Sequence, residues 1–197
     1  MNKEQLLGGL EEVADPRVIS AMSHVPRELF LPEPLQSRAY DDTPLPIGRG
    51  QTISAPHMVA IMCTILDLQP GMNVLEVGGG SGYHAAIMAE LVRPGGKVYS
   101  VERIAELVEA ARLNLDRAGV ENVTVIQSDG SLGLPEHAPY DRISVAATAP
   151  SIPEPLKQQL KSGGRMVIPV GEDSQELYLV TRKNGFSVER KMGVIFV

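Results

Sequence analysis

One stretch constrains the fold more than any other: residues 74–83, which read Val-Leu-Glu-Val-Gly-Gly-Gly-Ser-Gly-Tyr. A short apolar run is followed at once by four glycines among five residues, 78–82. The run is typical of a buried parallel strand, and the glycines are typical of a loop that opens a helix. Glycine adopts the unusual φ angles of such a turn and lets a ligand approach the backbone. The stretch predicts a nucleotide-sized binding shelf, with a plain tight turn as the alternative.

The chain after this stretch alternates helices and strands. Helices are predicted over about 83–92, 104–115 and 153–160, and strands over about 98–101, 123–127, 140–146 and 165–169. This alternation predicts a doubly wound, mostly parallel Rossmann-like sheet with helices on both faces. Residues 176–181 and 187–197, joined by the turn Asn184-Gly185, instead predict an antiparallel hairpin at the sheet edge.

The first third of the chain has a different texture. Residues 2–13 predict a short helix, and Asp15-Pro16 predicts the start of a second one. Between residues 25 and 52, five prolines and the run Gly-Arg-Gly at 48–50 interrupt regular structure, which predicts a long functional loop. We expect one domain over residues 1–197, with 1–69 as N-terminal helices and a cover on the substrate side and 70–197 as the α/β core.

After this loop, Ser54 is a candidate N-cap for a helix whose apolar residues recur at helical spacing through Leu66. Cys63 lies beside that apolar face. Because no neighbour in the sequence would stabilise a thiolate, we expect Cys63 to be an inert packing residue.

Composition narrows the class of protein. A chain of 197 residues with one cysteine can bury a core but cannot form an internal disulfide. No apolar run approaches the roughly 20 residues of a membrane span, and the first residues lack the pattern of a signal peptide. The net charge of -6, without a basic tract, argues against non-specific nucleic-acid binding. We therefore expect a soluble cytoplasmic protein that binds neither membrane nor nucleic acid.

Two acidic residues follow strands at the edge where a Rossmann-like sheet binds its ligand. Glu102 ends a strand 20 residues after Gly82, where a carboxylate can accept hydrogen bonds from both hydroxyls of an adenosine ribose. Asp129 could accept a hydrogen bond from the adenine amino group, and Gly130 would let the ring approach. The alternatives are an exposed carboxylate at a strand end and a turn-forming aspartate.

The glycine spacing separates two cofactor classes. Gly78-x-Gly80-x-Gly82 is one residue shorter than the dinucleotide fingerprint, in which a pyrophosphate lies against the helix N-terminus. A cofactor without phosphates suits the acidic surroundings better. S-adenosylmethionine fits, because it has no phosphates and carries a sulfonium cation.

Several further motifs identify a resemblance that runs from about residue 25 to residue 197. The segments that carry it are Val-Pro-Arg-Glu-Leu-Phe at 25–30, Pro-Leu-Pro-Ile-Gly at 44–48, Gly-Gln-Thr-Ile-Ser-Ala-Pro-His-Met at 50–58, Gly-Ser-Gly-Tyr-His at 80–84, Asp-Gly at 129–130 and Ala-Pro-Ser-Ile-Pro at 149–153. The chain resembles the protein-L-isoaspartate O-methyltransferases. The resemblance implies methyl transfer from S-adenosyl-L-methionine to the free α-carboxylate of isoaspartyl residues in damaged peptides and proteins, leaving S-adenosyl-L-homocysteine. The ester then collapses to a succinimide, which reopens partly as normal aspartate.

The resemblance also implies site residues. Ser54 corresponds to the active-site serine, so capping and catalysis are both open for it, and the residues implied near the substrate are Thr52, Ile53, His57 and Thr148. The loop residues Gly78, Gly79, Gly80, Ser81 and Gly82 would hold the methyl donor together with Glu102, Asp129 and Gly130. A carboxylate is ionised and nucleophilic at pH 7, so we expect no strong general base. The four histidines lack the spacing of a metal site, so we expect no metal.

Some positions depart from the family pattern. Gly79 stands where threonine is common, Ser128 and Ser131 flank Asp129-Gly130 where glycine and threonine are usual, and family members continue past the last strand. These departures leave alternatives: a methyltransferase for another substrate, a non-catalytic adenosine-binding or interaction module and, last, a nicotinamide oxidoreductase.

Overall fold

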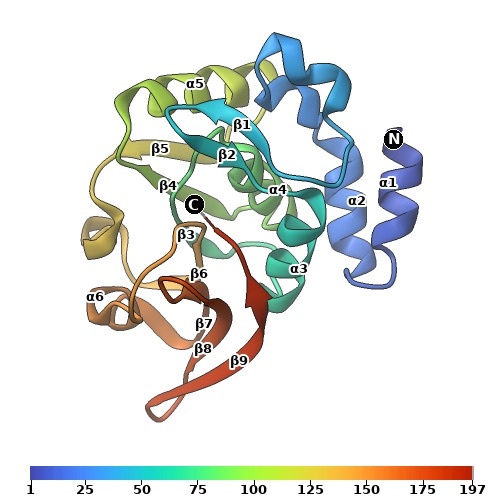
Figure 1. The fold of residues 1–197 in the computed structure, drawn as a ribbon. Coiled ribbons are helices and arrows are strands. Elements are labelled where there is room, and N and C mark those ends of the chain that lie inside the picture. The colour runs from blue at the N-terminus through green and yellow to red at the C-terminus, as the bar shows by residue number, and fades with distance from the viewer. Residues whose placement is uncertain (197) are drawn as a thin grey trace.

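A seven-stranded sheet forms the centre of the computed structural model, which describes residues 1–196 (Figure 1). The spatial order is β5-β4-β3-β6-β7-β8-β9. Five parallel strands come first: β5 (Val123–Gln127), β4 (Lys97–Glu102), β3 (Asn73–Val77), β6 (Tyr140–Val145) and β7 (Leu160–Val170). β8 (Gln175–Arg182) and β9 (Phe186–Val194) complete the sheet as an antiparallel edge. The prediction of a mostly parallel sheet with an antiparallel C-terminal hairpin is confirmed.

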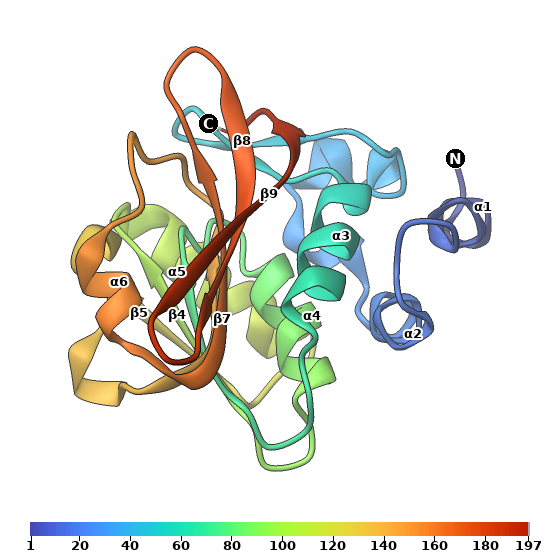
Figure 2. The same cartoon turned by 90° about the horizontal axis from the view of Figure 1, so that it is seen from below.

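Helices cover both faces of the sheet and bury two separate apolar clusters (Figure 2). On one face lie α3 (Pro56–Leu66), α4 (Tyr83–Leu91) and α5 (Ala105–Arg117), with α1 (Lys3–Leu10) and α2 (Pro16–His24) outside them. On the other lies α6 (Glu154–Gln158), near the 3-10 turns η3 (Gly130–Leu132) and η4 (Pro135–His137). β3 is apolar along most of its length because it is buried on both faces.

The proline-rich segment contains more regular structure than its sequence predicts. It forms two 3-10 helices, η1 (Arg27–Phe30) and η2 (Glu33–Arg38), and a two-stranded sheet of β1 (Leu45–Gly48) and β2 (Gln51–Ile53). The expectation of a long irregular loop is therefore wrong. Proline fits 3-10 turns and short exposed strands, where few backbone N–H groups are needed. In Figure 1 the β1–β2 hairpin crosses in front of the central sheet.

Other boundaries differ from the predicted ones. α1 ends at Leu10 rather than residue 13, and α6 covers only five residues. β7 begins at Leu160, so the glycines at 163 and 164 lie inside a strand rather than in a turn before it. The last residue of the predicted C-terminal strand, 197, lies outside the described residues. No helix within residues 1–196 is long and apolar enough to cross a membrane.

Candidate active site

The glycine-rich turn joins β3 to α4 at the carboxyl edge of the sheet, where the strand order reverses. Gly78, Gly80 and Gly82 have φ angles of 86°, 52° and 87°, which residues with side chains avoid. Gly82 is the N-cap of α4, and a Cβ there would lie 3.4 Å from the Cβ of Ala111 in α5. Its missing side chain therefore serves helix packing. The predicted strand, loop and helix are confirmed.

The N–H groups of this loop are bonded to its own chain. Those of Gly78 and Gly79 donate to the carbonyl of Val101 at 2.9 and 3.2 Å. That of Gly80 donates to Oε2 of Glu102 at 3.0 Å. A phosphate-binding loop needs free N–H groups that point at the anion. This arrangement supports the choice of a phosphate-free ligand that the glycine spacing predicts.

Glu102 closes β4 and borders the larger of two adjoining cavities. Its Oε1 accepts the backbone N–H of Ile104 at 2.9 Å, and its side chain is buried. Each carboxylate oxygen has two lone pairs, so the group can accept further hydrogen bonds from a ligand. The cavity beside it, here called the sheet-edge cavity, has a volume of about 380 Å³ and is lined in part by Gln51, Thr52, Gly78, Gly80, Glu102, Arg103, Asp129, Gly130 and Thr148.

Asp129 and Gly130 meet Glu102 in this cavity, although local contacts also explain both residues. Oδ1 of Asp129 accepts the backbone N–H of Ser131 at 3.0 Å, and this bond lowers the pKa of the carboxyl. A Cβ on Gly130 would lie 2.3 Å from Cγ1 of Val77. Glycine is therefore required here for packing on β3, in addition to any role toward a ligand.

A buried polar cluster lies beneath the glycine loop. Ser100 Oγ donates to Oε2 of Glu76 at 2.5 Å, and His84 Nδ1 lies 3.9 Å from Oε1. Burial raises the pKa of Glu76 to about 8, although the Ser100 bond opposes the shift, and burial lowers the pKa of His84 to about 4. Both groups are therefore mainly neutral at pH 7, and their contact is not an ion pair.

Cys63 belongs to the same cluster. Its Sγ lies 3.4 Å from Nε2 of His84, and burial raises the pKa of the thiol. A buried thiol without a nearby cation is a poor nucleophile. The prediction that Cys63 is an inert packing residue agrees with this environment.

The smaller cavity brings the predicted acceptor residues against the glycine loop. It has a volume of about 40 Å³ and is here called the inner cavity. Thr52, Ile53 and Ser54 line it together with Gly79 and Gly80 of the loop. Thr52 and Gly80 line both cavities, so the two spaces adjoin. A group held in the sheet-edge cavity would thus lie next to Ser54.

Ser54 does not cap α3, so the capping prediction is wrong. The N-cap is Ala55, whose side chain cannot accept a hydrogen bond. Asp42 instead accepts the backbone N–H of His57, the second residue of α3, at 2.9 Å. The cap therefore comes from 15 residues earlier in the chain, a contact that local sequence does not reveal. The Ser54 hydroxyl is free of this role.

Arg27 fastens the Ser54 segment to the rest of the site. Its side chain is fully buried, and Nε donates to the carbonyl of Ala39 at 2.8 Å. Nη2 donates to the carbonyl of Ser54 at 2.9 Å, and the guanidinium lies over the ring of Tyr83, 4.8 Å from its centroid. Burial lowers the pKa of Arg27. This one side chain joins the start of α3 to the start of α4.

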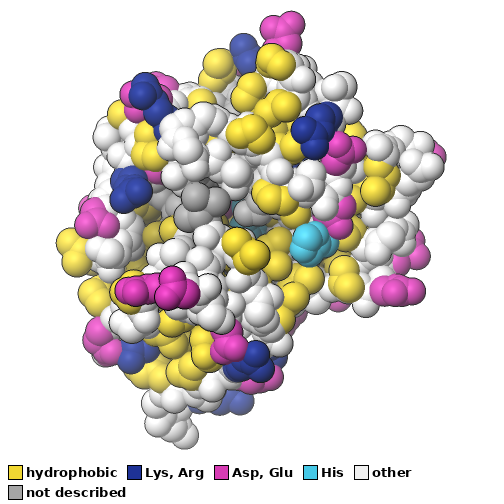
Figure 3. Space-filling view, viewed as in Figure 1, with side chains coloured by type: hydrophobic (Ala, Val, Ile, Leu, Met, Phe, Trp, Pro, Cys, Tyr) yellow, Lys and Arg dark blue, Asp and Glu magenta, His cyan; other side chains and the backbone are white. Residues whose placement is uncertain are grey.

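The remaining predicted residues lie at the margins. His57 is half-exposed on the first turn of α3. The Thr148 hydroxyl donates to the carbonyl of Gly171 at 2.8 Å, and Thr148 lines the sheet-edge cavity, away from Ser54. In Figure 3 a hollow opens near the middle of the face seen in Figure 1, with hydrophobic side chains and a histidine around it.

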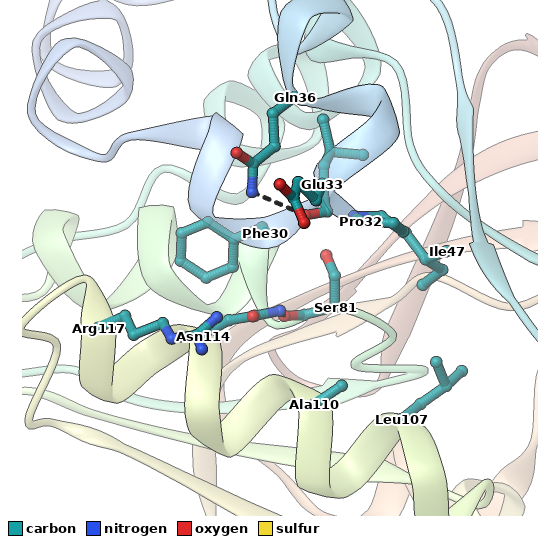
Figure 4. A pocket seen from close by; sticks show the side chains of 11 residues that line it. Phe30, Pro32, Glu33, Gln36, Ile47, Ser81, Leu107, Ala110, Asn114 and Arg117 are labelled. Carbon is teal, nitrogen blue, oxygen red and sulfur yellow. Dashed lines mark hydrogen bonds between the residues drawn. The ribbon is translucent and has the colours of Figure 1, made fainter.

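A third cavity lies on the other side of the glycine loop (Figure 4). It has a volume of about 440 Å³ and is enclosed between the η1–η2 segment and α5. Ser81 lines this outer cavity as well as the inner one, with its side chain pointing into the outer space in Figure 4. Ser81 is thus part of the wall between two cavities.

Sequence reasoning missed three residues of the site: Arg27, Asp42 and Arg103. Arg103 follows Glu102 directly and lines the sheet-edge cavity near Asp129, so its place at a strand end was a usable signal. Arg27 and Asp42 act through long-range contacts, for which a single sequence holds no signal. Within residues 1–196, no group of three or more His, Cys, Asp or Glu side chains could hold a metal ion.

Comparison with known sequences gives one family. The family model described as protein-L-isoaspartate(D-aspartate) O-methyltransferase (PCMT) matches residues 1–197. A relative from Methanothrix thermoacetophila, named protein-L-isoaspartate O-methyltransferase, is 67% identical over 197 residues, which cover 100% of this chain and 94% of the relative. One of the same name from Methanococcoides burtonii is 62% identical over 185 residues, 93% of this chain and 91% of its own.

Solved structures show the same fold. A protein-L-isoaspartate O-methyltransferase is similar with a TM-score of 0.92 and 35% identity, and the match covers all of this chain and 65% of that one. The beta-aspartate methyltransferase (PCMT) from Plasmodium falciparum, in complex with S-adenosyl-L-homocysteine, is similar with a TM-score of 0.89 and 33% identity, over 100% of this chain and 97% of that one.

Proposed function

The chain belongs to the protein-L-isoaspartate(D-aspartate) O-methyltransferase family, and on this premise we propose that it methylates the free α-carboxylate of L-isoaspartyl residues in damaged proteins and peptides. The methyl donor is S-adenosyl-L-methionine, and the product is S-adenosyl-L-homocysteine. The ester then closes to a succinimide and reopens partly as aspartate. The observation that carries the proposal is the adjoining of an acidic, nucleoside-sized cavity to a small cavity that contains Ser54.

The residues around the sheet-edge cavity fit the donor. Glu102 retains acceptor capacity for ribose hydroxyls, and Asp129 borders the same space for the adenine. The volume of about 380 Å³ lies in the range of roughly 300–1,000 Å³ that small-molecule sites occupy. The loop, Gly78–Gly82, commits its N–H groups internally, which suits a ligand without phosphates. When bound, S-adenosylmethionine supplies an electrophilic methyl group on a sulfonium cation.

The acceptor side needs positioning more than proton transfer. An isoaspartyl carboxylate is ionised at pH 7, so it requires no general base to become a nucleophile. We infer that the Ser54 hydroxyl donates a hydrogen bond to this carboxylate and orients it. Thr52 and Ile53 enclose the inner cavity and exclude water from it, and His57 at its margin faces the flanks of the peptide.

The remaining assignments follow from the sequence and belong to the same proposal. Residues 1–69 act as the cover on the substrate side and residues 70–197 as the donor-binding core of one domain. Thr148 contributes to the substrate side from the end of β6. The protein acts in the cytoplasm, without a nucleic-acid or membrane partner.

A paired-peptide assay tests the function. The protein is incubated with S-adenosylmethionine tritiated on the methyl group and with either an isoaspartyl peptide or the same peptide with normal aspartate. We expect label in the isoaspartyl peptide alone. Equal labelling of the two peptides, or none, contradicts the proposal.

Calorimetry separates the alternatives if labelling fails. Binding of S-adenosylhomocysteine without turnover on any isoaspartyl peptide would indicate a non-catalytic adenosine-binding module or a methyltransferase for another substrate. Tighter binding of NADH than of S-adenosylhomocysteine would indicate a nicotinamide enzyme.

A further inference from the structure

Asp42 makes an unusual pair of contacts at the start of α3. Its Oδ1 accepts the backbone N–H of His57 at 2.9 Å and lies 3.0 Å from Nδ1 of the same residue. One carboxylate oxygen therefore satisfies a free N–H of the helix and also binds the ring of the residue that carries it. Both side chains are partly exposed, at 32% for Asp42 and 42% for His57.

The first contact replaces the cap that the sequence lacks at this helix. Ala55 at the N-cap has no acceptor on its side chain, and the nearest hydroxyl in the sequence belongs to Ser54. A cap contributes about 1 kcal/mol, so a helix without one tends to recruit a neighbouring acceptor. Because Asp42 supplies the acceptor, Ser54 does not have to.

The second contact fixes the state of the imidazole. A carboxylate accepts hydrogen bonds and does not donate them, so Nδ1 of His57 must carry the hydrogen. In the neutral ring, Nε2 is then an acceptor, and it points away from Asp42. Within residues 1–196, Nε2 makes no hydrogen bond, and the ring is open to solvent.

We propose that Asp42 is a positioning residue of the acceptor site: it caps α3 in place of Ser54 and holds His57 so that Nε2 accepts an N–H from the flank of the bound peptide. The inference rests on the proposed function and deepens it. The inner cavity, at about 40 Å³, has no room for the residues that flank an isoaspartate. Those residues must lie over its margin, where the first turn of α3 presents His57.

The chain offers a matched control. Asp15 caps α2, and its Oδ1 accepts the backbone N–H of Arg17 at 2.8 Å. α2 and α3 both begin with proline, and in both the capped N–H belongs to the second residue. Asp15→Ala therefore removes an equivalent cap from a helix outside the site. Asp42→Ala removes the cap and the ring contact together, whereas His57→Ala removes the ring and keeps the cap.

Kinetics with the isoaspartyl peptide distinguish positioning from stability. We expect Asp42→Ala and Asp15→Ala to lower Tm by similar amounts. Only Asp42→Ala should raise the KM for the peptide, by about fivefold, the factor expected for one hydrogen bond. The Kd of S-adenosylhomocysteine should stay within twofold of wild type. Equal peptide KM values in the two variants would overturn the inference.

A double variant tests whether Asp42 acts through His57. Adding Asp42→Ala to His57→Ala should leave the peptide KM at the value of His57→Ala alone, because the ring that Asp42 orients is already gone. Asp42→Asn, whose amide oxygen can still accept both bonds, should keep Tm and recover most of the peptide KM. Multiplicative effects of the two alanine variants would contradict the inference.

Nitrogen NMR gives a readout that does not depend on activity. In the neutral ring of the wild type, the ¹⁵N shifts of His57 should report hydrogen on Nδ1. In Asp42→Ala they should move toward the form with hydrogen on Nε2, while Asp15→Ala leaves them unchanged. An unchanged tautomer in Asp42→Ala overturns the inference. If the wild type fails to label isoaspartyl peptide, the proposed function fails, and the NMR result still decides whether Asp42 orients His57.

Discussion

Replacing Ser54 with alanine separates its two predicted roles. The backbone carbonyl of Ser54 stays bonded to Arg27 in this variant, so only the hydroxyl is lost. The N-cap of α3 is Ala55, and the cap is supplied by Asp42. The substitution should therefore remove a contact to the substrate and leave the fold unchanged.

The structure sets the size of both effects. A hydrogen bond to a charged group contributes roughly 1.5–3 kcal/mol, so kcat/KM for the isoaspartyl peptide should fall by about 10- to 150-fold. Loss of a cap would cost about 1 kcal/mol and lower Tm by about 2–4 °C in a chain of this size. Because Ser54 is not the cap, we expect Tm to change by less than about 1 °C.

Three measurements check this prediction. Initial rates with the isoaspartyl peptide give kcat/KM, thermal unfolding gives Tm, and titration with S-adenosylhomocysteine gives Kd, which should stay within twofold of wild type. Asp42→Ala is the reference for a lost cap. A Tm that falls by 2–4 °C with unchanged kcat/KM would show that Ser54 is structural and that its place in the inner cavity has been misread.

Three further predictions concern the donor side. Glu102→Ala removes an acceptor that Gly80 uses and one that we assign to the ribose, so affinity for S-adenosylhomocysteine should fall by about 1–3 kcal/mol; a calorimetric Kd equal to that of wild type would show that the ribose lies elsewhere. Gly79→Ala places a Cβ 2.2 Å from Oγ of Ser100 and should destabilise the fold by about 1–3 kcal/mol in urea unfolding, with partial recovery on adding Ser100→Ala; full stability of the single variant would refute the clash. Because the pKa of Glu76 is raised to about 8 in the fold, its neutral form stabilises the protein below its ordinary value of 4.5, and this contribution is lost as the pH rises through about 8. The stability of Glu76→Gln relative to wild type should thus increase between pH 5 and pH 9, and parallel pH profiles would contradict the shift.

Gly79 shows how a departure from the family pattern acquires a physical meaning. The sequence reveals only that glycine stands where threonine is common. In the structure, Oγ of Ser100 occupies the space of a Cβ at this position and binds Glu76. The departure is therefore coupled to a neighbouring strand, which no local pattern could indicate.

Features set by adjacent residues were predicted well. The apolar run and the glycines at 78–82 correctly predicted the strand, the turn and the helix, because φ preferences and burial of a short strand are local properties. The spacing of three glycines also favoured a ligand without phosphates. The bonding of Gly80 to Glu102 agrees with that choice.

Features set by distant residues were not predicted. The proline-rich segment was expected to be irregular, yet β1 and β2 pair there and η1 brings Arg27 to the carbonyl of Ser54. Similarly, Ser54 was a good candidate cap by its position, but the acceptor comes from Asp42. In both cases, side chains that are separated along the chain compete for the same backbone groups.

The sequence by itself determined the fold class, the donor loop and the family, because each is recorded in short runs of residues with their own backbone preferences. Only the tertiary structure decided which group caps α3, what holds the segment around Ser54, and why Gly79 and Gly130 lack side chains. Those outcomes depend on which atoms reach a shared position first when the chain is compact. A linear pattern of residue types does not contain that distance information.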